Sequence, residues 1–245
     1  MKAPRKFQRS KARNAGQAPG IMRKVEDIIG MRLNKYLAHS GVASRRNAGD
    51  LVKQGQVTVN GSIEDNPAYQ VQEKDEVRYK GQLVSPSATL VYILLNKPRN
   101  VITTTKDERG RANVIELLDD PALEGLRLFP VGRLDRDTTG LLLITNDGDT
   151  AKRLTHPKHE VAKVYEATLD APFKPADLEK LRMGFQLEDG PVAVDWANLP
   201  DARDPKRVAL QIHIGRNRIV RRTFHHLGYE VEKLDRTYFA GLTKK

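Results

Sequence analysis

The 245-residue sequence contains no cysteine. It therefore has no disulfide framework, no thiol nucleophile and no zinc or iron–sulfur site with cysteine ligands. No uninterrupted apolar run approaches the roughly 20 residues that a bilayer-spanning helix needs. The first residues also lack the apolar core of a signal peptide. These absences predict a cytoplasmic protein that does not enter a membrane.

The usual signatures of metal, nucleotide and hydrolytic sites are missing as well. There is no P-loop, no serine nucleophile elbow and no compact Asp/Glu cluster for paired Mg²⁺ ions. His156 and His159 are three residues apart, but Pro157 between them favours a turn. His225 and His226 are adjacent and would face different sides of a helix. We therefore expect no metal and no cofactor.

Positive charge is what the sequence has in excess. It holds 42 Lys and Arg against 31 Asp and Glu, a formal net charge of +11. Such an excess suggests a polyanionic partner, either nucleic acid or an acidic membrane. Much of it comes from the first 25 residues, which contain no acid and show no apolar periodicity. We predict that residues 1–30 form a disordered basic arm that contacts RNA. The alternative is a solubilising tail.

Residues 31–61 have the pattern of a small folded module. Leu33 and Leu37 lie on one face of a helix, and Gly41 follows as its C′ residue. Ser44 can cap a second helix. The segment QVTVNG then alternates like a strand and ends in an Asn-Gly turn.

The second of these helices begins with Arg45 and Arg46. The helix dipole disfavours cations at this end, so a phosphate bound there would explain them; a solvated basic face is the alternative. The stretch closely resembles the S4 RNA-binding domain, which implies RNA binding but no reaction. The expected RNA contacts of this module are Arg32, Lys35, Arg45, Arg46 and Lys53.

Strand and helix patterns alternate in the rest of the chain. We expect a linker over 82–90 and then a catalytic-sized α+β domain over 91–245. The predicted strands are 91–96, 141–145, 163–169, 207–214 and 229–234, and the predicted helices are 149–155, 174–183 and 217–227.

The last of these helices carries two opposed stripes. Val220, Phe224 and Leu227 form the apolar stripe. The opposite side carries Arg218, Arg221, Arg222 and His225. Because these cations repel one another, we expect the basic stripe to face phosphates or a buried carboxylate. A solvated charged face is the alternative.

A run of charged residues also precedes a buried-strand pattern in VGRLDRDTTGLLLITNDG, residues 131–148. Either the run is a salt-bridged turn, or Asp135 is kept ionised beside the core for chemistry. Asp137 and Asp147 are interpreted as turn residues, since short acidic side chains stabilise turns. His156, before a proline, is interpreted as structural.

The same segment closely resembles the catalytic loop of the RsuA/RluB/RluE/RluF family of pseudouridine synthases, which act on ribosomal RNA. Similarity continues through residues 94–118, 156–165, 187–191 and 215–222. The string LEDGP at 187–191 is most similar to the branch that modifies large-subunit RNA. The resemblance implies an α+β protein. Its small S4-type RNA-binding domain over 31–81 would be followed by a pseudouridine synthase domain with a mixed, largely antiparallel sheet.

The resemblance also implies a reaction and its residues. A uridine would be flipped out, its glycosidic bond cut, the uracil turned, and C5 joined to C1′. Asp135 would be the nucleophile, attacking either C1′ or the uracil ring. Arg221 would hold Asp135 ionised. Tyr165 would stack on the flipped base and accept the C5 proton, and Arg133 would hold the backbone near the displaced nucleotide.

The expected RNA contacts of the catalytic domain are Arg133, Arg216, Arg218 and Arg222. The expected partner is ribosomal RNA, specifically 23S RNA of the large subunit, bound by a monomer. Two positions depart from the family pattern. Asn100 replaces a glycine, which Asn tolerates because it accepts positive φ, and Ile219 replaces a glutamine. The competing hypothesis is a non-catalytic RNA-binding or ribosome-assembly factor that retains the synthase fold. A DNA-binding regulator is a more distant alternative.

Overall fold

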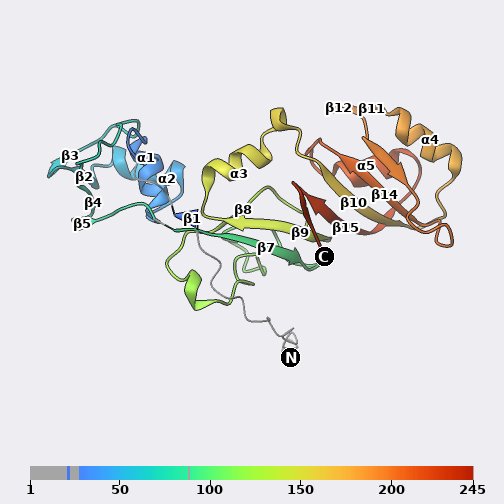
Figure 1. Cartoon of the computed structure of the whole chain (residues 1–245), viewed down its shortest axis with the longest axis horizontal. Coiled ribbons are helices and arrows are strands. Elements are labelled where there is room, and N and C mark those ends of the chain that lie inside the picture. The colour runs from blue at the N-terminus through green and yellow to red at the C-terminus, as the bar shows by residue number, and fades with distance from the viewer. Residues whose placement is uncertain (1–20, 23–27, 88, 245) are drawn as a thin grey trace. The chain divides into compact units, whose positions relative to one another are not determined.

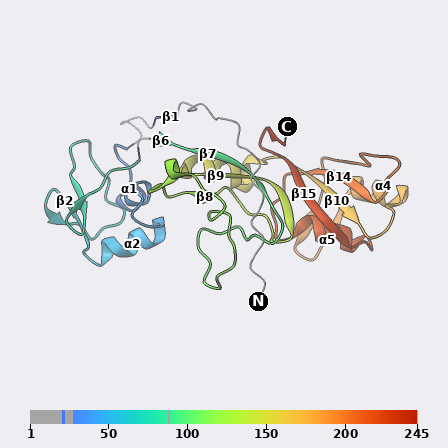
Figure 2. The same ribbon diagram turned by 90° about the horizontal axis from the view of Figure 1, so that it is seen from below.

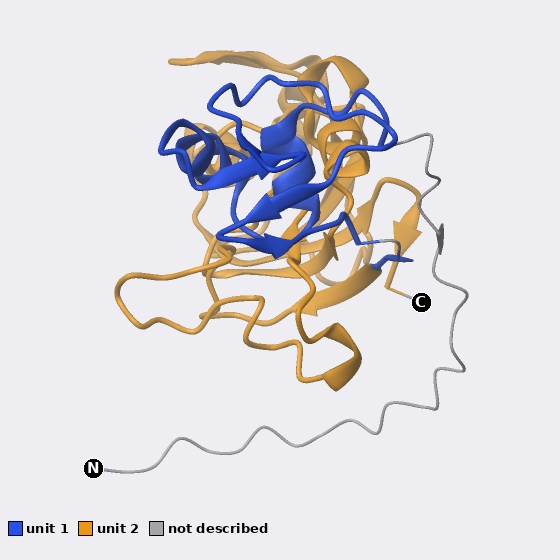
Figure 3. Ribbon diagram, turned by 90° about the vertical axis from the view of Figure 1, so that its left-hand side faces the viewer, with its two compact units in different colours: residues 1–91 blue, residues 92–245 orange. Residues whose placement is uncertain are grey.

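The computed structural model describes residues 21–22, 28–87 and 89–244. It divides into two compact units, residues 1–91 and 92–245 (Figure 3). Most of the predicted basic arm, residues 1–20 and 23–27, lies outside the described residues. Each unit is a separate fold with its own core.

The first unit packs two helices against a small antiparallel sheet. Its buried core includes Leu33, Leu37, Val52 and Val57, each with 0% of its surface exposed. The sheet has the strand order β3–β2–β4–β5. The elements are α1 (Leu33–His39), α2 (Arg45–Lys53), β2 (Val57–Val59), β3 (Ser62–Ile63), β4 (Val77–Tyr79) and β5 (Gln82–Leu83).

The local signals read from the sequence of this unit are confirmed. The Ser44 side chain accepts a hydrogen bond from the Asn47 backbone N–H at 3.2 Å, which caps α2. Gly41 has a φ of +82° just after α1. Asn60 and Gly61 both have positive φ between β2 and β3, as a tight hairpin turn requires.

The predictions at both ends of this unit need correction. Within the expected arm, Ile21–Met22 form β1, which pairs with β6 (Thr89–Leu90). Within the expected linker over 82–90, β5 belongs to the sheet of the first unit and β6 pairs with β1. Both segments carry short strands because a partner strand distant in the chain supplies their hydrogen bonds.

The second unit is organised around an eight-stranded sheet within the described residues. Its main path is β13–β14–β10–β15–β9–β7, with β8 paired to β9 and β16 to β15. All pairs are antiparallel except β9 with β15, which confirms the mixed, largely antiparallel sheet. The strands are β7 (Tyr92–Lys97), β8 (Phe129–Pro130), β9 (Thr138–Thr145), β10 (Lys163–Leu169), β13 (Trp196–Asn198), β14 (Arg207–Ile212), β15 (Val231–Phe239) and β16 (Leu242–Thr243).

The helices of this unit follow the predicted positions closely. They are α3 (Gly148–Thr155), α4 (Pro175–Met183) and α5 (Ile219–His226), with short 3₁₀ turns η2 (Pro121–Leu123) and η3 (Pro157–His159). A hairpin of β11 (Phe185–Leu187) and β12 (Gly190–Val192) follows α4 (Figure 1). The strand predicted at 229–234 is wrong in its bounds, because β15 pairs with β9 as far as Arg236 and with β10 as far as Phe239.

Strands β9 and β15 approach each other closely at one point. Gly140, with a φ of +113°, lies opposite Arg236, and a Cβ on Gly140 would collide with the Arg236 backbone. Glycine is therefore required at this position. Figure 2 shows β15 passing between β9 and β10, so the loop before β9 and the side chains of β10 and β15 are brought together.

Candidate active site

The loop before β9 carries Asp135, and several hydrogen bonds fix its shape. Thr103 Oγ1 donates to the Leu134 carbonyl at 2.7 Å and accepts from the Leu134 N–H at 3.2 Å. The Thr138 N–H donates to the Asp135 carbonyl at 3.1 Å. Asp135 is thus displayed on a tight turn at the start of a buried strand.

A fully buried lysine, Lys97, donates hydrogen bonds to the backbone of this loop. Lys97 Nζ donates to the carbonyls of Thr138 at 2.8 Å, Pro98 at 2.9 Å and Arg136 at 3.4 Å. Burial lowers the pKa of Lys97 to about 8, while the nearby aspartates of the loop oppose that shift. The sequence interpretation missed this role. Its only signal was a lysine at the end of an apolar strand, in LNKP.

Asp135 lies at the edge of a cavity of about 540 Å³, which Tyr165 also lines. Tyr165 projects from β10 and is 9% exposed. Arg133 and Arg218 reach the same cavity from the loop and from α5. Side chains from three separate segments therefore line one hollow, whereas Arg221, which was predicted to share the site, is not part of its lining.

The ion pairs of α5 differ from the prediction. Arg221 was expected to pair with Asp135, but its Nη2 lies 2.9 Å from Asp137 Oδ2. Arg218 Nη1 lies 3.5 Å from Asp137 and 3.6 Å from Asp135. Asp137, interpreted as a turn residue, is therefore an acceptor shared by two arginines.

The largely buried position of Arg221 explains why it contacts Asp137. Its side chain is 11% exposed, and its Nη1 donates to the Val231 carbonyl at 2.6 Å. Burial lowers the pKa of Arg221, with Asp137 and then Asp135 opposing the shift. The field of Arg221 thus reaches both carboxylates, although the direct contact is to Asp137. Arg218, at the N-cap of α5, has a left-handed backbone with a φ of +46° and lines the cavity together with Asp135.

The other cations of the basic stripe also face carboxylates. Arg222 Nη2 lies 2.7 Å and Arg216 Nη1 2.9 Å from Asp189, in the turn of the β11–β12 hairpin. His225 Nδ1 lies 2.7 Å from Glu230. The stripe does face carboxylates, but Asp189 and Glu230 are exposed, so the prediction of a buried carboxylate is not confirmed at these positions.

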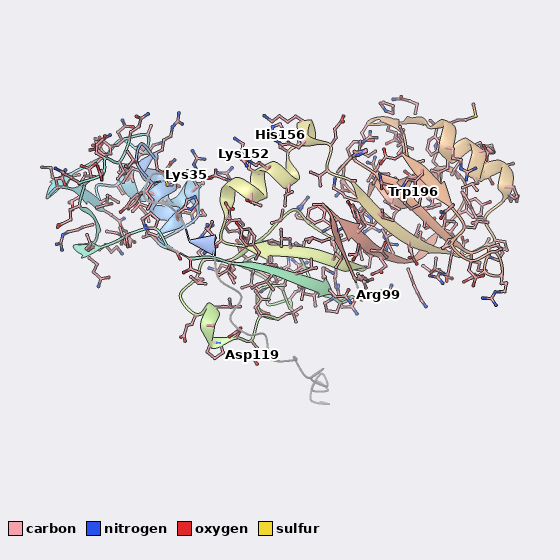
Figure 4. All side chains as sticks on the ribbon, viewed as in Figure 1. Lys35, Arg99, Asp119, Lys152, His156 and Trp196 are labelled. Carbon is pink, nitrogen blue, oxygen red and sulfur yellow. The ribbon has the colours of Figure 1, made fainter. Side chains whose placement is uncertain are left out.

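Unlike the cations of α5, most candidate RNA contacts of the first unit are exposed and have no carboxylate partner among the described residues. Arg32, Arg45, Arg46 and Lys53 are exposed, and no ion pair involves them among the described residues. Lys35, on α1, is half-buried (Figure 4).

Four further sequence interpretations can be placed. Asp147 caps α3 by accepting from the backbone N–H of Asp149 and Thr150, so it is structural. His156 caps the turn η3 and lines the cavity rim (Figure 4). Asn100 has a φ of +67°, which confirms its positive-φ role. Ile219, in place of a polar residue, is buried at the start of α5.

Two other kinds of feature are absent from the described part of the chain. No group of three or more His, Cys, Asp or Glu residues there could hold a metal ion. No helix there is long and apolar enough to cross a membrane.

The two units match the models of two protein families. A family model described as RNA pseudouridylate synthase matches residues 91–226, and the S4 domain model matches residues 31–77. The chain therefore belongs to the RNA pseudouridylate synthase family, in its S4-bearing, RsuA/RluB-like branch.

Named relatives agree with this assignment. Ribosomal large subunit pseudouridine synthase B of Bacillus subtilis is 42% identical, covering 86% of each chain. Dual-specificity RNA pseudouridine synthase RluF of Escherichia coli is 37% identical, covering 84% of this chain and 69% of its own. A crystal structure of a pseudouridylate synthase superposes with a TM-score of 0.59 at 30% identity, covering 87% of this chain and 90% of the other.

Proposed function

We propose that this enzyme converts a uridine of 23S ribosomal RNA to pseudouridine. The observation that carries the proposal is the meeting of Asp135 and Tyr165 in one cavity beside the arginines of α5. This arrangement supplies a carboxylate nucleophile, an aromatic face for a flipped base and cations for the backbone.

Each side chain then has a distinct task. Asp135 attacks either C1′ or the uracil ring, and Arg218 and Arg221 hold its negative charge in place. Tyr165 stacks on the flipped base and takes the proton from C5. Arg133 contacts the backbone next to the displaced nucleotide. The reaction is an isomerisation, so these roles need neither a redox partner nor a group donor.

The choice of ribosomal RNA is supported by the relatives. The Bacillus subtilis relative is named for the large ribosomal subunit, and the LEDGP string of this chain is most similar to that branch. The exposed cations of the first unit supply phosphate contacts without base readout. We propose further that the protein acts as a monomer in the cytoplasm.

Mapping pseudouridine in ribosomal RNA tests the proposal directly. Cells lacking the gene should lack one pseudouridine in 23S RNA, and the wild-type gene should restore it. An Asp135→Asn gene should not. If the map is unchanged while ribosome assembly is impaired, the protein is instead a non-catalytic assembly factor that retains the fold.

A further inference from the structure

Two cations without a carboxylate partner line the active-site cavity. Lys163 projects from β10 and Arg236 from β15. Arg236 is only 2% exposed and Lys163 is half-buried. Among the residues that the structure describes, neither forms an ion pair, whereas the arginines of α5 all do.

Each of these cations has a donor that the protein leaves unused. Lys163 Nζ donates to the carbonyls of Val161 at 2.7 Å and His213 at 2.9 Å, which leaves a third N–H. Arg236 Nε donates to the Leu141 carbonyl at 2.8 Å, but its Nη2 has no partner. Its guanidinium lies 4.4 Å from the ring centre of Phe239, which leaves it little freedom to find another.

The two charges also repel each other. Burial and the neighbouring Arg236 lower the pKa of Lys163 to about 8. Asp195 attracts the ammonium more weakly, and its carboxylate is already 2.7 Å from His213 Nδ1. Buried like charges with unused donors are unfavourable unless an acceptor enters the cavity.

The register of the sheet indicates what that acceptor is. Tyr165 and Arg236 are directly opposed on β10 and β15, and Lys163 lies two residues before Tyr165 on the same face. Resting on the proposed function, we propose that Lys163 and Arg236 bind the carbonyl oxygens of the flipped uracil and stabilise the negative charge that develops on its ring. Cytosine carries an amino group, itself a hydrogen-bond donor, where uracil has a carbonyl oxygen. Lys163 and Arg236 would have no acceptor there, which disfavours cytidine.

The chemistry requires such stabilisation. When the C1′–N1 bond breaks, its electron pair stays with the ring while Asp135 bonds to C1′, and the resulting anion is shared by N1 and the ring oxygens. C5 then attacks C1′ and the Asp135 carboxylate leaves. The proton lost from C5 balances the one gained at N1. Attack of Asp135 on the ring instead would also place charge on a carbonyl oxygen, so the two donors serve either route.

The test is a comparison of substrates as well as variants. Full-length Lys163→Gln and Arg236→Gln proteins would be measured under single turnover on a 23S RNA transcript and on the same transcript containing 5-fluorouridine. The readout is cleavage of the N1–C1′ bond at the target nucleotide, because 5-fluorouridine has no C5 proton to lose and forms no pseudouridine. Fluorine withdraws electrons and makes the ring anion intrinsically more stable. Lys233→Gln is the matched control, because Lys233 is exposed on the other face of β15.

We expect each active-site variant to react about 100-fold more slowly with uridine and about 10-fold more slowly with 5-fluorouridine, with RNA affinity nearly unchanged. The control Lys233→Gln should react at the wild-type rate on both transcripts. Lys163→Arg, which keeps the charge, should recover most of the loss. If Arg236→Gln fails to fold, Lys163→Gln alone carries the test.

Equal losses on both transcripts would overturn the inference, because they would show that the cations only support the fold. Full activity of Lys163→Gln would overturn it as well. Neither result would affect the proposed function, which fails only if the wild-type protein makes no pseudouridine in the transcript.

Discussion

The cations of the two units differ in what surrounds them. On the first unit, Arg45 and Arg46 are exposed at the start of α2, and no ion pair holds them among the described residues. On the second unit, Arg218 and Arg221 are held by Asp135 and Asp137, and Arg222 by Asp189. Arginine therefore occurs in two settings: exposed at the start of α2, without an ion pair in the described part of the chain, and paired with carboxylates on the second unit.

This difference separates binding from chemistry. Exposed cations release counterions when they meet phosphates, so they contribute affinity that depends strongly on salt. Cations already paired with carboxylates gain less from a phosphate, because it must compete with the existing partner. What they contribute is orientation and a fixed field around the nucleophile. The following four predictions test this division.

The largest effect should come from the nucleophile. Asp135→Asn keeps the shape of the side chain but removes its charge, so product should fall below detection while RNA affinity stays within about threefold. Asp137→Asn is the control, since it lies on the same loop and should retain measurable activity. Single-turnover assays and filter binding would measure both. Substantial product from pure Asp135→Asn would contradict the assignment.

The second effect tests the arginine–aspartate pairs. Arg221→Ala leaves Asp137 without its 2.9 Å partner and weakens the field at Asp135. We expect a rate loss equivalent to about 2–4 kcal/mol with little loss of binding. Combining Arg221→Ala with Asp137→Asn should cost less than the sum of the two changes.

The third effect concerns the first unit. Arg45→Gln with Arg46→Gln should weaken RNA binding about tenfold and reduce the slope of log affinity against log salt by about 1.5, at roughly 0.7–0.9 per phosphate contact. The single-turnover rate at saturating enzyme should not change. Lys80→Gln is an exposed control on the same unit, after β4. An unchanged slope would show that α2 only carries a solvated basic face.

The smallest effect is a pH dependence of the wild-type rate. Lys163 is charged below its pKa of about 8 and neutral above it, so the rate should fall as pH rises through about 8. One unit higher, about a tenth of the protein keeps the charge. Lys163→Arg should move this fall to higher pH. The other charged or titratable groups at this cavity are Arg133, Asp135, His156, Glu160, Tyr165, His213, Arg216, Arg218 and Arg236, with Asp195 beside His213.

A rate that stays flat above pH 8 in wild type would show that the Lys163 charge is not used. If the same fall persists unchanged in Lys163→Arg, it belongs to another group at the cavity.

The sequence predicted the local structure well wherever a short segment fixes its own conformation. Ser44 caps α2, and Asn60 and Gly61 form the turn of the β2–β3 hairpin. On α5, Val220 and Phe224 are buried, as the apolar stripe predicted. These features depend on neighbours within a few residues. The expected linker over 82–90 failed for the opposite reason, since β6 exists only because β1 pairs with it.

By itself, the sequence determined the fold class and the family and predicted the residues that carry chemistry, because each lies within a short recognisable string. The tertiary structure alone decided which groups meet. Arg221 contacts Asp137 although 84 residues separate them. Arg236 stands opposite Tyr165 only because of the register between β15 and β10. The distance between two side chains that far apart in the sequence is fixed only by packing and strand pairing. Their interaction energy depends on that distance, so it too is decided by the tertiary structure.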